Sequence, residues 1–216
     1  MDNESLPEQY QHTVNTFNQA AELYLEYFKD FKLYQQTYDW LLAAMNENHA
    51  QILDIACGPG QVDYYLLQSM PDLQITGIDL APKMITLAKK LNPACTYQIM
   101  DCREIDTLAT TYDVIICGFC LPYLCHKDMT ALLQTMTQMV QSNGLIYLST
   151  ITSEQADGYQ TSKSAKGKTF VHYHDIELIK STLQQAGCSI IRHEHIIHVH
   201  NDKEVRDEFV LALKLA

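Results

Sequence analysis

Short apolar runs alternate along the chain with longer amphipathic stretches, as strands alternate with helices in many globular proteins. Five runs carry the apolar or β-branched side chains typical of strands: residues 52–56, 73–80, 96–100, 112–118 and 145–151. Apolar residues at helical spacing lie between the runs, for example over 61–70 and 127–141. Nearly continuous apolar strands that alternate with helices predict an α/β domain around a mostly parallel sheet buried on both faces.

Both ends of the chain depart from this alternation. Residues 1–12 are polar and acidic, and we expect them to be disordered or loosely attached. Apolar residues at helical spacing over 14–45 predict two helices with a break near residues 29–32. At the other end, residues 188–199 and 205–215 are two strand patterns around a polar turn, and they predict a terminal antiparallel hairpin.

A polar segment without apolar periodicity covers residues 152–168 and predicts a long loop, followed by a short extended piece at 170–174. Its lysines form the only basic cluster of the sequence and would favour an anionic substrate: Lys163, Lys166 and Lys168. The helix expected over 127–141 should end at Asn143-Gly144, a pair typical of helix C-termini. A further helix should begin at Asp175 and be closed by Gly187.

The composition and charge of the chain disfavour several classes of function. The 216 residues are 47% hydrophobic, which is typical of a globular domain with a full core. The net charge of −11 disfavours a nucleic-acid surface, which would need a basic stripe. No apolar run reaches the roughly 20 residues of a membrane span, and no signal peptide is visible. Seven cysteines, an odd number, fit reduced thiols and a cytoplasmic location.

The stretch from 51 to 60, QILDIACGPG, joins a strand to a helix through a glycine turn. Gly58 and Gly60 let the backbone bend sharply or approach a ligand closely. The helix that follows would point unpaired N–H groups toward that ligand. Asp79 ends the next strand about 20 residues later, where an acid can take the hydroxyl pair of a ribose. These features predict a ligand that contains a nucleoside.

The sequence ILDIACGPG resembles the first motif of class I S-adenosylmethionine-dependent methyltransferases, which reads acid-x-Gly-x-Gly-x-Gly. Asp54, Ala56, Gly58 and Gly60 stand at those positions, and Ala56 departs from the first glycine. A nicotinamide oxidoreductase would need the spacing G-x-G-x-x-G, which does not occur here because residues 61–63 contain no glycine.

The resemblance implies a Rossmann-like fold with a seven-stranded, mostly parallel sheet, a C-terminal antiparallel hairpin and an N-terminal helical lid. Residues 1–48 would form the lid of a single domain whose α/β core covers 49–216. Aromatic side chains of the lid would then close over cofactor and substrate: Tyr24, Phe28, Tyr34 and Tyr38.

The resemblance also implies a site for S-adenosylmethionine made of Asp54, Ala56, Cys57, Gly58, Gly60, Asp79, Leu80, Met84, Asp101, Cys102, Gly118, Phe119 and Tyr24. Asp79 would hold the ribose, while Leu80 and Met84 would flank the adenine. Asp101 and Cys102 would lie beside the adenine amino group. Asp54 would support the glycine turn or reach the cofactor's amino group. An aromatic ring such as that of Tyr24 would favour the positive sulfonium.

The implied reaction is in-line transfer of a methyl group to a small-molecule acceptor, with S-adenosylhomocysteine as the product. Four residues near the predicted strand ends are candidates for accepting a proton: His172, His174, Tyr123 and His126. A metal is not expected. Cys117, Cys120 and Cys125 are better explained as small buried thiols. The histidines at 193, 195, 198 and 200 are better explained as solvent-facing residues of an edge hairpin.

Two other functions fit the same motifs. A methyltransferase of this fold can act on a protein, and a non-catalytic module can bind the cofactor or its product without turnover. The loops that form an acceptor pocket follow no readable code. The acceptor, the atom methylated, the use of a general base, the closure of the lid or loop and the oligomeric state therefore stay open.

Overall fold

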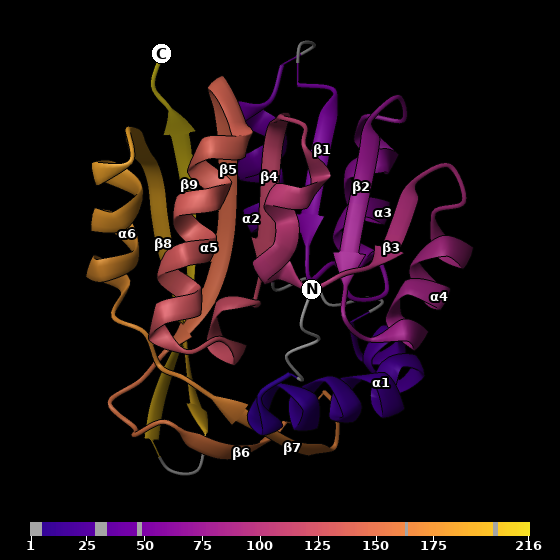
Figure 1. Ribbon diagram of the computed structural model, residues 1–216, viewed down its shortest axis with the longest axis vertical. Helices are drawn as coiled ribbons and strands as arrows, with labels where there is room; N and C mark the ends of the chain where they lie inside the picture. The colour runs from indigo at the N-terminus through magenta and orange to yellow at the C-terminus, as the bar shows by residue number, and fades with distance from the viewer. Residues whose placement is uncertain (1–5, 29–33, 47–48, 163, 201–202) are drawn as a thin grey trace.

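The computed structural model describes residues 6–28, 34–46, 49–162, 164–200 and 203–216. Within these residues the main sheet has seven strands in the order β3-β2-β1-β4-β5-β9-β8 (Figure 1). The strands are β1 (Gln51–Ile55), β2 (Gln74–Asp79), β3 (Thr96–Ile99), β4 (Tyr112–Gly118), β5 (Val140–Thr152), β8 (Cys188–His200) and β9 (Lys203–Lys214). The first five pair in parallel, and β9 is antiparallel to both β5 and β8. The predicted α/β fold with a C-terminal hairpin is confirmed.

Helices cover both faces of this sheet. The helices are α1 (Glu8–Phe28), α2 (Gln35–Ala44), α3 (Gln61–Ser69), α4 (Pro82–Leu91), α5 (His126–Met139) and α6 (Ile176–Gln185). In Figure 1, α5 and α6 lie in front of the sheet, with α2 and α3 behind it. Successive residues of β4 therefore enter different cores. Ile115 packs in the cluster that includes Leu133 of α5, whereas Ile116 packs in the cluster that includes Leu66 of α3. This two-sided burial explains why the strand is apolar throughout.

The carboxyl ends of the parallel strands are covered by α1 and by a separate two-stranded sheet (Figure 1). That sheet is an antiparallel pair, β6 (Gly158–Ser162) and β7 (Gly167–Val171). Thr16 of α1 donates to the Lys168 carbonyl over 2.8 Å, and Thr13 accepts from the Phe170 N–H over 3.2 Å. Helix α1 and the small sheet thus form one cover over the strand ends, where ligands bind in folds of this type.

Three expectations about local structure were wrong. Residues 8–12 are helical rather than loose, because Tyr10 is buried against the core; residues 1–5 lie outside the described part. Residues 158–162 and 167–168 of the segment expected to be a loop belong to β6 and β7, which pair with each other and contact α1. Helix α5 ends at Met139, before Asn143-Gly144, and those two residues lie inside β5.

The two N-terminal helices are confirmed, and the break expected near residues 29–32 falls outside the described residues. Gly187, with φ of +83°, follows α6 in the left-handed conformation typical of a helix end. No helix of the described chain is long and apolar enough to cross a membrane.

Candidate functional site

Three adjoining cavities lie between the cover and the strand ends. The first, of about 140 Å³, lies among α1, Asp79 and the short helix Leu121–Tyr123. The second, of about 300 Å³, borders the glycine turn, and the third, of about 340 Å³, lies among α1, the small sheet and β9. Tyr24 and Phe119 line all three. The three cavities therefore meet at these two rings and form one site with three compartments.

Asp79 is the acid of the first cavity, at the end of β2. Its Oδ2 accepts the Gly58 N–H over 3.0 Å, and its Oδ1 accepts the Ala81 N–H over 2.8 Å. Burial raises the pKa of Asp79 to about 6, although the two N–H bonds oppose that rise. A carboxylate has about four acceptor positions, so each oxygen keeps capacity for one more donor. The arrangement suits a ligand with two neighbouring hydroxyl groups.

The turn after β1 takes its shape from left-handed backbone. The φ angles of Ala56, Gly58 and Gly60 are +57°, +54° and +79°. A side chain at Gly58 would point into the cavity toward Tyr24, whose Cε1 lies 3.9 Å from an ideal Cβ position. The missing side chain therefore leaves room for a ligand between the turn and α1.

A buried hydrogen-bonded network lies under this turn. Asp54 of β1 and Asp63 of α3 bond to each other, and the Tyr97 hydroxyl donates to Asp63 Oδ2 over 2.7 Å. The Asn92 amide donates to the Tyr97 oxygen over 3.0 Å and to the Gly60 carbonyl over 2.8 Å. Burial, and then the neighbouring Asp63, raise the pKa of Asp54 well above its usual range.

Because burial raises the pKa of both acids, we expect them to share one proton. Without it, Asp54 Oδ2 and Asp63 Oδ1 would both be buried without a hydrogen-bond partner. The pair keeps one negative charge beside the second cavity, which Asp54 lines.

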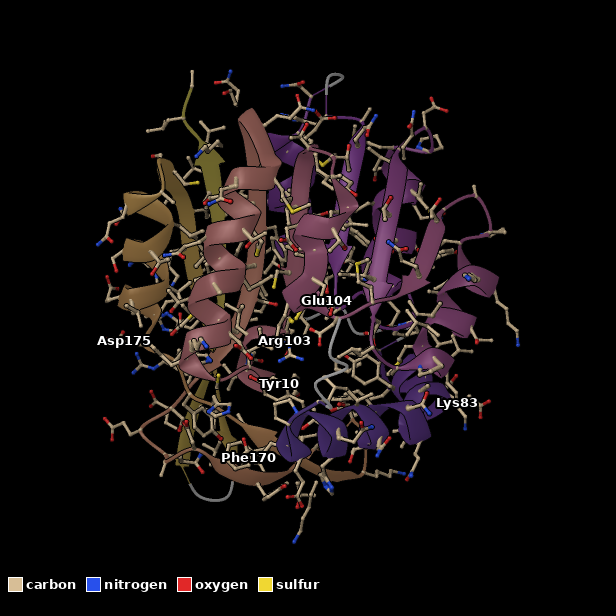
Figure 2. All side chains as sticks on the ribbon, viewed as in Figure 1. Tyr10, Lys83, Arg103, Glu104, Phe170 and Asp175 are labelled. Atoms are coloured by element: carbon tan, nitrogen blue, oxygen red, sulfur yellow. The ribbon has the colours of Figure 1, made fainter. Side chains whose placement is uncertain are left out.

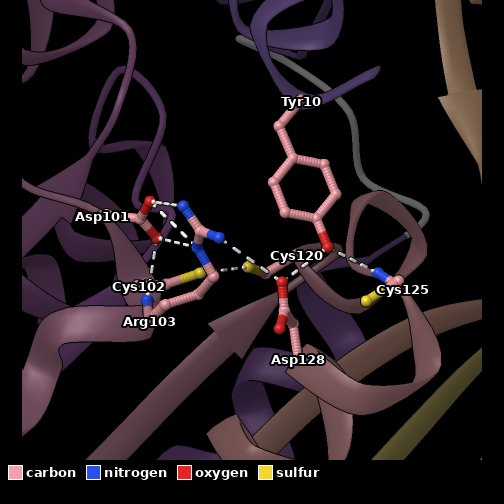
Figure 3. Close-up of polar contacts among 7 residues, drawn as sticks. All are labelled: Tyr10, Asp101, Cys102, Arg103, Cys120, Cys125 and Asp128. Atoms are coloured by element: carbon pink, nitrogen blue, oxygen red, sulfur yellow. Dashed lines mark hydrogen bonds and ion pairs between the residues drawn. The ribbon is translucent and has the colours of Figure 1, made fainter. Parts of the chain in front are cut away.

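A second polar cluster fastens the start of α1 to the core (Figure 3). The Tyr10 hydroxyl donates to Asp128 over 2.8 Å and accepts the Cys125 N–H over 2.8 Å. The Arg103 guanidinium lies 5.2 Å from the centre of the Tyr10 ring and 2.7 Å from Asp101 Oδ2. Figure 2 places Tyr10 and Arg103 together between α1 and the strand ends. The cluster links the cover to Asp101, which lines the first cavity.

We expect Tyr10→Phe to lower the free energy of unfolding by about 1 to 2 kcal/mol, because the Cys125 N–H and Asp128 both lose their partner. Urea unfolding measures the change. Tyr64→Phe is the control, since this tyrosine is 47% exposed, and its removal should cost less than about 0.5 kcal/mol. Equal effects of the two substitutions would contradict the anchoring role of Tyr10.

Residues 52–144 match the sequence profile described as a methyltransferase domain. A putative methyltransferase, 235L of Invertebrate iridescent virus 6, is 29% identical over 110 residues, 51% of this chain and 39% of the viral protein. The malonyl-(acyl-carrier protein) O-methyltransferase of Acetivibrio thermocellus is 29% identical over 153 residues, 68% of this chain and 53% of that enzyme. By sequence, residues 52–144 of this chain belong to a methyltransferase domain.

Solved structures extend the likeness of the domain over its whole length. The magnesium protoporphyrin IX methyltransferase of Synechocystis PCC 6803, crystallised with bound S-adenosylmethionine, superposes with a TM-score of 0.70 at 19% identity. The match covers 98% of this chain and 99% of that one. At this identity the likeness supports the fold alone. By sequence, the chain spans about half the length of the two relatives above.

The methyltransferase domain brings nearly all the predicted cofactor residues together. The first cavity is lined by Tyr24, Ala56, Gly58, Asp79, Leu80, Met84, Asp101, Cys102, Gly118 and Phe119. Asp54 and Cys57 line the second. Gly60 lines neither; it precedes α3 and packs against Asn92 and Tyr97. Their roles toward a ligand stay predictions.

The four proton-acceptor candidates do not share one place. Tyr123 lines the first and third cavities, and burial raises its pKa far above its usual range, so its hydroxyl stays protonated. His174 is buried, with Nε2 3.0 Å from the carbonyls of Leu121 and Leu124. His172 pairs with Asp157 through Nδ1 at 2.7 Å, and His126 is exposed at the start of α5. These contacts give His174 and His172 structural partners.

The structure also shows the contacts or exposure of most of the histidines and cysteines that were expected to be structural. His193 bonds to Glu208 over 2.8 Å, His195 is exposed, and the side chains at 198 and 200 lie outside the described part. Cys117 and Cys120 are buried as expected, whereas Cys125 is only partly buried. The Cys120 sulfur lies 3.8 Å from that of Cys102, a predicted cofactor residue (Figure 3). Lys166 and Lys168 are exposed and line none of the three cavities, and Lys163 is outside the described residues.

Sequence reasoning expected Tyr24 and Phe28 of α1 at the site, and both line it, but it missed the residues nearer the start of that helix. Tyr10, Thr13, Val14 and Phe17 line the first cavity together with Tyr24. Helical spacing of apolar residues can indicate that one face of a helix is buried. It does not show whether that face packs on the core or lines a cavity. Asp63 was also missed, because an acid in the first turn of a helix is ordinarily a solvated residue.

Proposed function

We propose that this protein transfers the methyl group of S-adenosylmethionine to a small-molecule acceptor. The observation that carries the proposal is the first cavity, where Asp79 at the end of β2 faces a left-handed turn after β1. A strand-end acid beside such a turn is the arrangement that binds a ribose in Rossmann-like folds.

The lining residues fit this cofactor in three ways. Asp79 can accept two more hydrogen bonds, as the ribose hydroxyls require. The negative charge shared by Asp54 and Asp63 beside the second cavity suits the cofactor's ammonium group. The rings of Tyr24 and Phe119, where the cavities meet, suit the positive sulfonium.

When bound, the cofactor supplies a methyl group on a positively charged sulfur, which is a good leaving group. The chain then has to bind, align and dehydrate the reactants rather than provide strong acid or base catalysis. Asp79 and the turn fix the cofactor, and α1 with the small sheet keeps water from the junction of the cavities. Tyr123 lies at that junction as a hydrogen-bond donor.

The third cavity supports a small acceptor rather than a protein surface. It has about 340 Å³ and lies under α1 and the small sheet, which leaves room for a compact molecule or a single side chain. The names of the relatives offer no common acceptor, because one acts on a malonyl-(acyl-carrier protein) and the other on magnesium protoporphyrin IX. The acceptor has to be argued from this chain's own cavity.

Isothermal titration calorimetry with S-adenosylmethionine, S-adenosylhomocysteine and NAD tests the proposal. We expect micromolar binding of the first two and no binding of NAD. An acceptor screen that follows methyl transfer then separates an enzyme from a module that only binds the cofactor. If neither sulfur compound binds the wild-type protein, the proposed function is wrong.

The pKa of Asp79 predicts how cofactor affinity depends on pH. The ribose hydroxyls need the ionised carboxylate as an acceptor, and this group has a pKa of about 6 in the ligand-free protein. Affinity should be constant above pH 7 and should fall by up to about tenfold per pH unit below 6. Calorimetry between pH 5 and 8 measures it, and a flat profile would contradict the role of Asp79.

The stability of the ligand-free protein should change with pH in the opposite direction. Because burial raises the pKa of Asp79 and of Asp63 to about 6, the folded state binds more protons than the unfolded state between about pH 4 and 6. Their contribution to stability is therefore present at low pH and is lost as the pH rises through 6. Affinity and stability changing in opposite directions distinguishes ligand binding from general acid denaturation.

A further inference from the structure

We propose that the third cavity binds its acceptor through a positively charged or charge-developing nitrogen, so that the acceptor is an amine. This inference rests on the proposed function and names its substrate class. Two observations carry it: the cavity is walled by aromatic rings, and the carboxylate that lines it is deeply buried.

Four of the aromatic rings that line the cavity contact one another in a row: Tyr24, Phe28, Tyr34 and Phe119. The cavity is lined by Tyr24, Phe28, Tyr34, Phe119, Tyr123 and Tyr173. The ring centres of Tyr24 and Phe28 lie 4.6 Å apart, and those of Tyr34 and Phe119 lie 5.3 Å apart. Aromatic faces attract cations, and groups of such rings are the usual site for ammonium ligands.

The carboxylate is Asp207 of β9, which is 3% exposed. Its Oδ2 accepts the Tyr34 hydroxyl over 2.5 Å, a length typical of a bond to an ionised acid. Burial raises the pKa of Tyr34 and of Tyr123, and the charge of Asp207 raises both further, so its field reaches both tyrosines. The described lining includes no lysine, arginine or histidine. Among the described lining residues an anionic acceptor would therefore meet Asp207 and no basic side chain, and neither Lys166 nor Lys168 lines the cavity.

The chemistry of transfer favours the same class. The reacting form is the uncharged amine, so an acceptor that arrives as an ammonium ion first releases a proton to water. The lone pair of the amine then forms the N–C bond while the C–S bond breaks and the electron pair of that bond stays on sulfur. The positive charge therefore moves from sulfur to nitrogen, and the product ammonium later releases its proton to water. Aromatic faces and a carboxylate stabilise that developing charge. A phenolate or carboxylate acceptor would instead have to be bound as an anion next to Asp207.

The adjacent acid of the strand offers a matched control. Glu208 is also 3% exposed, but it faces the other side of β9, where Thr152 donates to it over 3.0 Å and His193 lies 2.8 Å away. It lines none of the three cavities of the site. Replacing Glu208 therefore removes an equally buried acid without touching the acceptor cavity.

The test compares choline with 3,3-dimethylbutan-1-ol, which has nearly the same shape and no charge. Calorimetry is done with saturating S-adenosylhomocysteine. We expect choline to bind at least about tenfold more tightly than the alcohol. Asp207→Asn should weaken choline binding about tenfold and leave the alcohol unchanged, while Glu208→Gln should change neither. Unchanged affinity for S-adenosylhomocysteine shows that each variant is folded.

Three outcomes would overturn the proposal: equal or tighter binding of the alcohol, tighter binding of the anion 3,3-dimethylbutanoate, and no binding of any probe. If Asp207→Asn does not fold, the comparison in the wild-type protein decides alone. A failure of the proposed function would be recognised separately, because the wild-type protein would then not bind S-adenosylhomocysteine. The choline comparison is then repeated without that ligand and still reports on the cavity.

Discussion

Replacing Asp79 with alanine is expected to weaken S-adenosylmethionine binding at least about 100-fold. The carboxylate would accept both ribose hydroxyls, and hydrogen bonds to a charged group contribute about 1.5 to 3 kcal/mol each, where 1.4 kcal/mol is a factor of ten. The variant also loses the acceptor for the N–H groups of Gly58 and Ala81, which shape the turn. Calorimetry at pH 7.5 measures the loss, because the wild-type carboxylate is ionised there.

A matched variant separates the ligand contribution from the structural one. Asp113 also accepts two backbone N–H bonds, from Ala50 over 3.0 Å and from Gln51 over 2.8 Å. It lies near the start of β4, however, at the opposite end of the parallel strands from Asp79. Asp113→Ala should lower stability as much as Asp79→Ala and leave cofactor affinity within about twofold. If both variants lose binding alike, the effect comes from lost stability and Asp79 has no special role.

The parts of the site that could be predicted are those set by short stretches of sequence. Asp79 follows a strand pattern, and Gly58 follows another, so the chain order of a parallel sheet alone places them at the same edge. The left-handed φ of Gly58 agrees with this prediction. Ala56 adopts φ of +57° as well, so its departure from the family's glycine leaves the turn conformation intact.

The parts that could not be predicted depend on contacts between distant segments. The small sheet exists because β7 contacts α1 through Thr13 and Thr16, more than 150 residues away in the chain. Asp207 belongs to a strand whose pattern predicts a hairpin, and only the folded chain brings it to Tyr34 at a separation of 173 residues. Local periodicity cannot show which distant segments come into contact, so the sequence predicted a helical lid but neither the small sheet nor the place of Asp207 in the third cavity.

The same limit applies to the support of the glycine turn. Nothing in the sequence indicates that Asn92 and Tyr97 reach back to Gly60, yet Asn92 donates to its carbonyl and both side chains fill the space beside it. The conformation of the turn and this packing make Gly60 more sensitive to an added methyl group than Gly58, the other glycine of the turn.

Gly60→Ala is expected to lower the free energy of unfolding by about 3 kcal/mol. An alanine at φ of +79° costs about 1 to 2 kcal/mol by itself. Its Cβ would lie 2.7 Å from Asn92 Nδ2 and 3.1 Å from the Tyr97 oxygen, and crowding of this kind costs a further 1 to 3 kcal/mol or so. Thermal unfolding should shift down by about 6 to 12 °C for a chain of this size.

Substitutions at two other glycines separate the cost of the left-handed backbone from the cost of crowding. Gly58→Ala has the left-handed strain, with φ of +54°, but its Cβ meets only Tyr24 at 3.9 Å, so about 1 kcal/mol should be lost. Gly158→Ala meets nothing within 4 Å and should leave stability nearly unchanged. Cofactor affinity should follow a different order, because only the Gly58 methyl group would enter the cavity. A Gly60 variant as stable as the Gly158 variant would show that the network under the turn yields to the added methyl group and does not hold the turn in place.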